Sequence, residues 1–83
     1  MLPAHKARRR IPKSFRILGH VIRVRQVTPS ELKKIVEEDV ALDGLWIDSE
    51  KTIYVDKNLS IFTKRQVLFH ELAHCINDLR EEG

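Results

Sequence analysis

Apolar spacing near the C-terminal end of the chain constrains the fold most. On a wheel of about 100° per residue, five residues fall within one sector about 100° wide: Leu68, Leu72, Cys75, Ile76 and Leu79. A sector of that width is typical of a helix that packs one face on a core. We therefore predict a helix from about Lys64 to Leu79, with Thr63 to Gln66 as a capping box at its start.

Four strand-like segments precede that helix in two pairs. The first pair is Phe15 to Leu18 and Val21 to Val27, around Gly19-His20. The second is Leu45 to Asp48 and Thr52 to Asp56, separated by Ser49-Glu50-Lys51. Each pair is predicted to form a β-hairpin.

A second helix is predicted between the two hairpins. Thr28 is a good N-cap, Pro29 suits the first helical position, and Glu31 closes a capping box with Thr28. The helix is expected to run to about Asp39 and to pack through a stripe that includes Leu32 and Ile35.

The order strand, strand, helix, strand, strand, helix predicts an α+β fold. Two helices would pack on a small, mostly antiparallel sheet made of two hairpins. The 83 residues suffice for one small domain, for which we expect residues 14–83, after a flexible basic leader at residues 1–13. A bound metal would add to the stability of such a small domain.

Charge is unevenly distributed along the chain. Residues 1–30 hold eight Lys or Arg and no Asp or Glu, whereas residues 31–83 hold seven basic and twelve acidic residues, so the net charges are +8 and −5. The basic arm is a candidate for weak contact with nucleic acid or an acidic partner, and a solvated leader is the alternative. Its basic residues are Lys6, Arg8, Arg9, Arg10 and Lys13.

The cysteine content and hydropathy favour the cytoplasm. Cys75 is the only cysteine, which excludes an intramolecular disulfide, and we expect it to be a buried apolar residue rather than a metal ligand. No apolar run approaches the roughly 18 residues of a membrane span, and the N-terminal segment lacks the apolar stretch of a signal peptide.

The segment His70-Glu71-Leu72-Ala73-His74 is an HExxH motif within the predicted C-terminal helix. Histidines four residues apart lie one helical turn apart, so their imidazoles can converge on one zinc ion. Glu71 is rotated by about 100° from His70, which suits a base for metal-bound water rather than a third ligand. The alternative is a chance match on the solvated helix face.

The stretch from Gly44 through Thr52-Ile53-Tyr54-Val55-Asp56 to the HExxH segment resembles the zincin metallopeptidases. It is most similar to the small ImmA/IrrE-like proteins common in phages and mobile elements, and the resemblance covers about the C-terminal half. It implies that His70 and His74 are zinc ligands and Glu71 is the catalytic base. It also implies that the strand near Tyr54 guides an extended peptide by edge pairing.

The third metal ligand is the main departure from that family. ImmA/IrrE-like proteins usually take it from a glutamate on a further helix, whereas this chain stops nine residues after His74 and so looks short at its C-terminus. The candidates are Asp78, Glu81 and Glu82, the last two if the helix ends near Leu79. Another subunit could supply the ligand, or it could be missing.

Three functions follow from these patterns. The leading one is a zinc-dependent metallopeptidase acting on a protein or peptide in the cytoplasm, or in the host cytoplasm if phage-encoded. The first alternative is a catalytically silent zincin relative that binds protein or nucleic acid. The second is a structural α+β protein with a chance motif.

Overall fold

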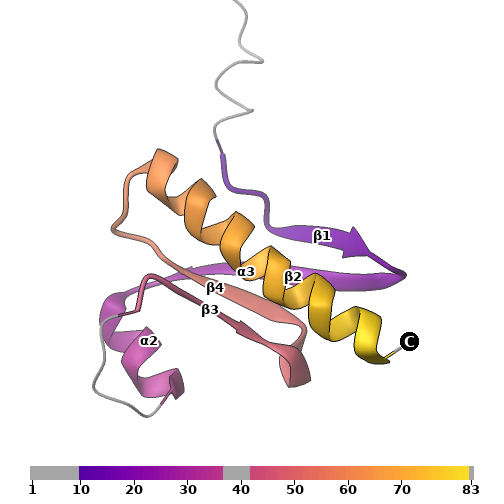
Figure 1. Cartoon of the computed structure of the whole chain (residues 1–83). Helices are drawn as coiled ribbons and strands as arrows, with labels where there is room; N and C mark the ends of the chain where they lie inside the picture. Colours follow the sequence, from indigo (N-terminus) through magenta and orange to yellow (C-terminus); the bar gives the residue numbers. More distant parts are fainter. Residues whose placement is uncertain (1–9, 37–41, 83) are drawn as a thin grey trace, which may run out of the picture.

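The computed structural model describes residues 10–36 and 42–82. Its elements are β1 (Ser14–Ile17), β2 (His20–Val27), α2 (Pro29–Val36), β3 (Gly44–Ile47), the short 3-10 helix η1 (Asp48–Glu50), β4 (Thr52–Asp56) and α3 (Ile61–Glu82). Figure 1 shows α3 crossing the strands and α2 lying at one end of the sheet. The predicted α+β class and element order are confirmed. No helix in this part of the chain is long and apolar enough to cross a membrane.

The four strands form one sheet in the order β1-β2-β4-β3. Both outer pairings, β1 with β2 and β3 with β4, are the predicted antiparallel hairpins. The central pairing of β2 with β4 is parallel, with Val24 opposite Ile53 and Gln26 opposite Val55. Because α2 and β3 lie between β2 and β4 in the chain, the connection has room to return to the same end of the sheet.

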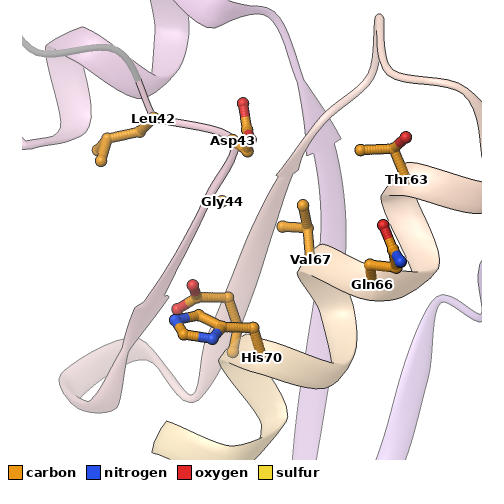
Figure 2. Close-up of a pocket in the computed structure, with 8 residues that line it drawn as sticks. Leu42, Asp43, Gly44, Thr63, Gln66, Val67 and His70 are labelled. Atoms are coloured by element: carbon orange, nitrogen blue, oxygen red, sulfur yellow. The ribbon is translucent and has the colours of Figure 1, made fainter.

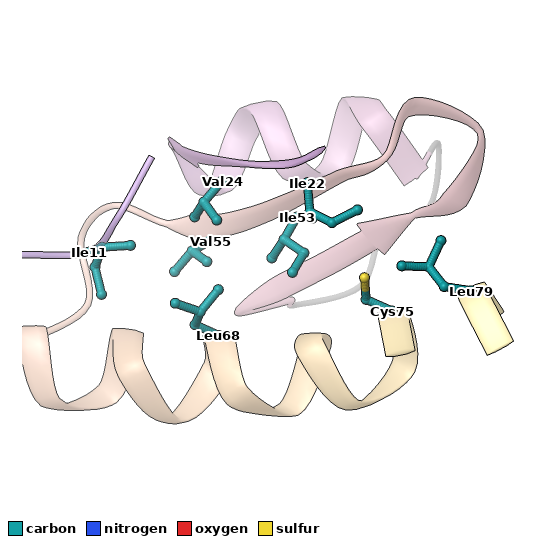
Figure 3. Close-up of a cluster of buried hydrophobic side chains, with 8 residues drawn as sticks. All are labelled: Ile11, Ile22, Val24, Ile53, Val55, Leu68, Cys75 and Leu79. Carbon is teal, nitrogen blue, oxygen red and sulfur yellow. The ribbon is translucent and has the colours of Figure 1, made fainter. Parts of the chain in front are cut away.

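The main core lies between α3 and one face of the sheet. Alternate residues of β2 and β4 face the helix, which contributes three residues with almost no exposed surface. Figure 3 shows these side chains together: Ile11, Ile22, Val24, Ile53, Val55, Leu68, Cys75 and Leu79. A smaller cluster of Val27, Leu32 and Tyr54 brings in α2 on the opposite face, because Val27 and Tyr54 alternate with the residues that face α3.

The predicted packing face of α3 is mostly confirmed. Leu68, Cys75 and Leu79 are buried and Leu72 is partly buried, but Ile76 is 39% exposed. Ile76 lies at the margin of the apolar sector, about 60–100° from the three buried residues, and the sheet does not reach it.

The sequence predicted the start of α2 correctly but not the start of α3. The predicted capping box of α2 is present, with Glu31 N donating to Thr28 Oγ1 at 3.2 Å and Thr28 N donating to Glu31 Oε1 at 3.1 Å. The box expected at Thr63 is wrong, because Ser60 caps α3: Thr63 N donates to Ser60 Oγ at 3.2 Å. Thus α3 begins three residues earlier than expected. The expected end of α2 near Asp39 lies outside the described residues.

Part of the expected leader belongs to the folded domain. Ile11 is buried in the main core, and the carbonyl oxygen of Lys13 accepts a hydrogen bond from Val24 N at 2.8 Å. The ordered packing therefore extends back to at least Ile11. Residues 1–9 of the expected leader lie outside the described part of the chain.

A side-chain hydrogen bond joins β3 to α3. Trp46 Nε1 donates to Asp78 Oδ2 at 2.8 Å, and both side chains are partly buried. Because the partners come from an edge strand and the second half of a long helix, this bond limits sliding of β3 along α3.

We expect Trp46→Phe to lower the free energy of unfolding by about 1–2 kcal/mol, because it leaves the partly buried Asp78 carboxylate without this donor. Denaturant unfolding of wild type, Trp46→Phe, Asp78→Ala and the double variant measures the effect. The double variant should lose less free energy of unfolding than the two single variants lose in total. Additive losses would contradict a direct contribution of this bond.

Candidate metal centre

His70 and His74 present their ring nitrogens to each other on the exposed side of α3. The two Nε2 atoms are 3.3 Å apart, the ring centroids are 4.8 Å apart, and the ring planes are inclined by 82°. Two nitrogens bound to one tetrahedral zinc, each at about 2.0–2.1 Å, lie about 3.3–3.4 Å apart. The spacing of this pair therefore fits two ligands of one zinc ion. At the same distance two neutral imidazoles can share a hydrogen bond, which depends on their tautomers.

Glu71 lies on the flank of α3 that approaches β3, not on the fully solvated side. Its side chain is half-buried, whereas His70 and His74 are exposed. A Cβ atom built at Gly44 would lie 3.5 Å from Glu71 Cγ, so the stem of Glu71 passes close to the start of β3. The solvated helix face of the chance-match alternative therefore describes the two histidines but not Glu71.

A pocket of about 410 Å³ lies between the first half of α3 and the start of β3, and His70 and Glu71 are part of its wall. Figure 2 shows the lining residues on the first half of α3 and on the segment that leads into β3: Leu42, Asp43, Gly44, Thr63, Gln66, Val67 and His70, together with Glu71. The wall mixes apolar and polar groups. It is large enough for a side chain of a bound molecule next to the two motif residues.

The sheet edge nearest this pocket belongs to β3. In the described sheet β3 pairs with β4 on one side only, so its other side is an edge that can accept an extended peptide. The expectation that the strand near Tyr54 provides this edge is wrong, because β4 pairs with both β2 and β3. Tyr54 instead packs in the cluster with Leu32, and its hydroxyl donates to Glu50 Oε1 at 2.6 Å. This hydrogen bond and burial raise the pKa of Tyr54.

The candidates for a third metal ligand do not join the histidine pair. The Asp78 carboxylate accepts the hydrogen bond from Trp46. Glu81 and Glu82 were candidates only if the helix ended near Leu79, and α3 continues to Glu82, so that condition is not met. Within residues 10–36 and 42–82, no group of three His, Cys, Asp or Glu could hold a metal ion. This part of the chain therefore brings together two nitrogen donors, with Glu71 in the wall of the neighbouring pocket.

Cys75 takes no part in the candidate centre. It is fully buried in the main core, and burial raises the pKa of its thiol. A thiol that is harder to ionise is a poorer metal ligand, so the prediction that Cys75 is a structural apolar residue agrees with its position.

Sequence reasoning missed the β3 side of the pocket. The predicted strand began at Leu45, whereas Gly44 begins β3 and the carbonyl oxygen of Asp43 accepts a hydrogen bond from Asp56 N at 2.8 Å. A Cβ at Gly44 would collide with Cγ1 of Val67 and lie 2.9 Å from the carbonyl oxygen of Tyr54. A glycine directly before strand residues was the available signal.

Compared with known protein families, curated proteins and solved structures, the chain shows no significant match. The zincin resemblance therefore stays a prediction based on the motif and its setting.

We expect Gly44→Ala to push β3 away from α3 and to lower the free energy of unfolding by about 1–3 kcal/mol, because the added methyl overlaps Val67. Denaturant unfolding measures the loss. In a Val67→Ala background, Gly44→Ala should lower the free energy of unfolding by less, because the colliding Cγ1 methyl of Val67 is absent. An equal cost in both backgrounds would show that the contact with Val67 is not the cause.

Proposed function

We propose that the protein is a zinc-dependent metallopeptidase of the HExxH type, which hydrolyses peptide bonds in a protein or peptide substrate. The observation that carries the proposal is the 3.3 Å separation of the His70 and His74 Nε2 atoms, next to a half-buried glutamate at a pocket wall. His70 and His74 would hold the zinc ion. When bound, zinc would polarise the scissile carbonyl and lower the pKa of a water molecule towards about 7.

Glu71 is the proposed general base. Its carboxylate would accept the proton of the attacking water and pass it to the leaving amine. Its place on the β3 flank of α3 supports this role, since the acceptor then lies between the metal-binding nitrogens and the strand where substrate would bind. The packing of its stem near Gly44 restricts the directions that the carboxylate can take.

Substrate would bind along β3 and in the adjacent pocket. The unpaired side of β3 offers backbone donors and acceptors to an extended peptide, and one substrate side chain would enter the pocket of about 410 Å³. Leu42 and Val67 give this pocket apolar surface, whereas Asp43 and Gln66 give it polar groups.

The incomplete ligand set favours a second candidate, a catalytically silent relative that binds metal or a partner without hydrolysis. A catalytic zinc normally has three protein ligands and one water. Asp78 is engaged by Trp46, and the described residues hold no three-ligand group. For the active enzyme, a ligand from another subunit or from outside the described residues would complete the site.

The proposed compartment is the cytoplasm, or the host cytoplasm for a phage-encoded protein. A single cysteine that is fully buried in the core supports a protein that does not depend on disulfides.

We expect the purified protein to bind one zinc ion, and His70→Ala and His74→Ala each to lose it, because each removes one of two adjacent ligands. Metal analysis after dialysis against micromolar zinc measures the stoichiometry. His20→Ala is the matched control, since His20 lies in the β1–β2 hairpin and should leave zinc binding unchanged. A wild-type protein without zinc would overturn the metal site.

We expect Glu71→Gln to keep zinc but to lower peptide hydrolysis by roughly 10²–10⁴-fold, because the amide cannot accept the water proton. Cleavage of a fluorogenic peptide library by the zinc-loaded protein provides the measurement, with Glu81→Gln on the same helix as the control. Zinc binding without hydrolysis by the wild type would favour the silent relative. Full activity of Glu71→Gln would refute the assignment of the base.

A further inference from the structure

Three arginines lie on the face of the β1–β2 hairpin that points away from α3. Ile22 and Val24 of β2 are buried under α3, so the alternation of the strand places Arg23 and Arg25 on the other face. Arg16 of β1 is directly opposite Val21, which shares that face with Arg23. All three arginines are exposed.

The three arginines are neighbours on this face of the hairpin. Arg23 and Arg25 are two residues apart on one strand, a spacing of about 6.6–6.8 Å. Arg16 is the diagonal neighbour of Arg23, at roughly 7–8 Å. Within the described residues, the Arg16 and Arg23 side chains make no hydrogen bond or ion pair. None of the three arginines is directly opposite another, and together they form a positively charged surface that favours an anionic partner.

Two acids, Glu31 and Glu50, lie near the Arg25 end of this face. Hydrogen bonds from Thr28 and, to a lesser extent, the charge of Arg25 lower the pKa of Glu31. Glu50 accepts a hydrogen bond from Tyr54. Arg25 lies over the Tyr54 ring, 6.0 Å from its centroid, and this contact leaves its charge in place. Glu31, at the start of α2, is held by hydrogen bonds with Thr28. The strands β1 and β2 themselves contain no Asp or Glu, so the hairpin carries a net positive charge.

The tip of the same hairpin is exposed and apolar. Leu18 and Val21 are 61% and 53% exposed, and Leu18 adopts a left-handed backbone (φ 50°) in the turn with Gly19. A Cβ at Gly19 would meet nothing within 4 Å. Since β4 pairs with β2 only from Arg23 onward, the tip extends past the end of β4. Figure 1 shows this turn at the edge of the molecule, well away from α2.

We propose that this hairpin face binds the phosphate backbone of nucleic acid, without reading base sequence. Guanidinium groups bind phosphate oxygens through paired hydrogen bonds, and all three cations are arginines. Arg23 and Arg25 are about 6.7 Å apart along β2, so they can contact separate phosphates of one backbone. Leu18 and Val21 would contact sugars or bases beside the backbone. This proposal does not depend on the metallopeptidase function.

The test measures fluorescence anisotropy of labelled 20-nucleotide single strands and 20-base-pair duplexes between 50 and 200 mM salt. Three phosphate contacts predict a slope of about −2.7 in log affinity against log salt for duplex, hence a roughly 40-fold loss of affinity over that range. Arg16→Gln with Arg23→Gln should reduce the slope by about two. Its thermal midpoint should equal or exceed that of the wild type, because repulsion is relieved.

Lys34→Gln with Arg80→Gln is the matched control, since it removes the same charge from α2 and α3. It should keep most of the wild-type slope. The proposal would be overturned if both double variants reduced the salt slope equally, or if Arg16→Gln with Arg23→Gln left it unchanged. Absence of binding at 50 mM salt would overturn it too. Binding to phosphatidylserine vesicles without nucleic-acid binding would assign the face to membranes and would also overturn it.

Discussion

The packing of α3 on one face of the sheet is the contact on which the rest of the structure depends. Leu68, Cys75 and Leu79 are buried against alternate residues of β2 and β4, and this fixes the rotation of the helix about its own axis. With that rotation set, His70 and His74 must face solvent and Glu71 must lie on the flank towards β3. A rotation of one residue position, about 100°, would bury one set of polar groups and separate Glu71 from the pocket.

The distance between α3 and β3 is the second constraint, because the pocket is formed between them. Gly44 lets the strand approach where any side chain would collide with Val67. Further along, the Trp46 indole reaches Asp78. The close approach at Gly44 sets the distance between β3 and α3 at the pocket, and the bond from Trp46 to Asp78 limits sliding of β3 along α3. The same bond also holds Asp78, one of the candidates for the third metal ligand.

Local signals in the sequence predicted the elements well, and non-local contacts account for what was missed. The capping box of Thr28 and Glu31, the strand composition and the HExxH spacing involve residues a few positions apart. The parallel pairing of β2 with β4 and the bond of Trp46 to Asp78, 32 residues apart, depend on how the elements assemble. Gly44 is an example of a non-local requirement. A side chain there would collide with Val67 of α3, and the residues around Gly44 do not reveal where α3 packs.

The two proposed binding surfaces point in opposite directions across one thin sheet. The histidine pair and its pocket lie on the α3 side, whereas Arg16, Arg23 and Arg25 lie on the other face of the β1–β2 hairpin. Alternation within β2 produces this separation, since Ile22 and Val24 contact the helix and the arginines between and beside them do not. A peptide along β3 would lie at one sheet edge, and a polyanion on the hairpin would lie near the other. Occupation of one surface therefore leaves the other sterically accessible, and each can be tested while the other is intact.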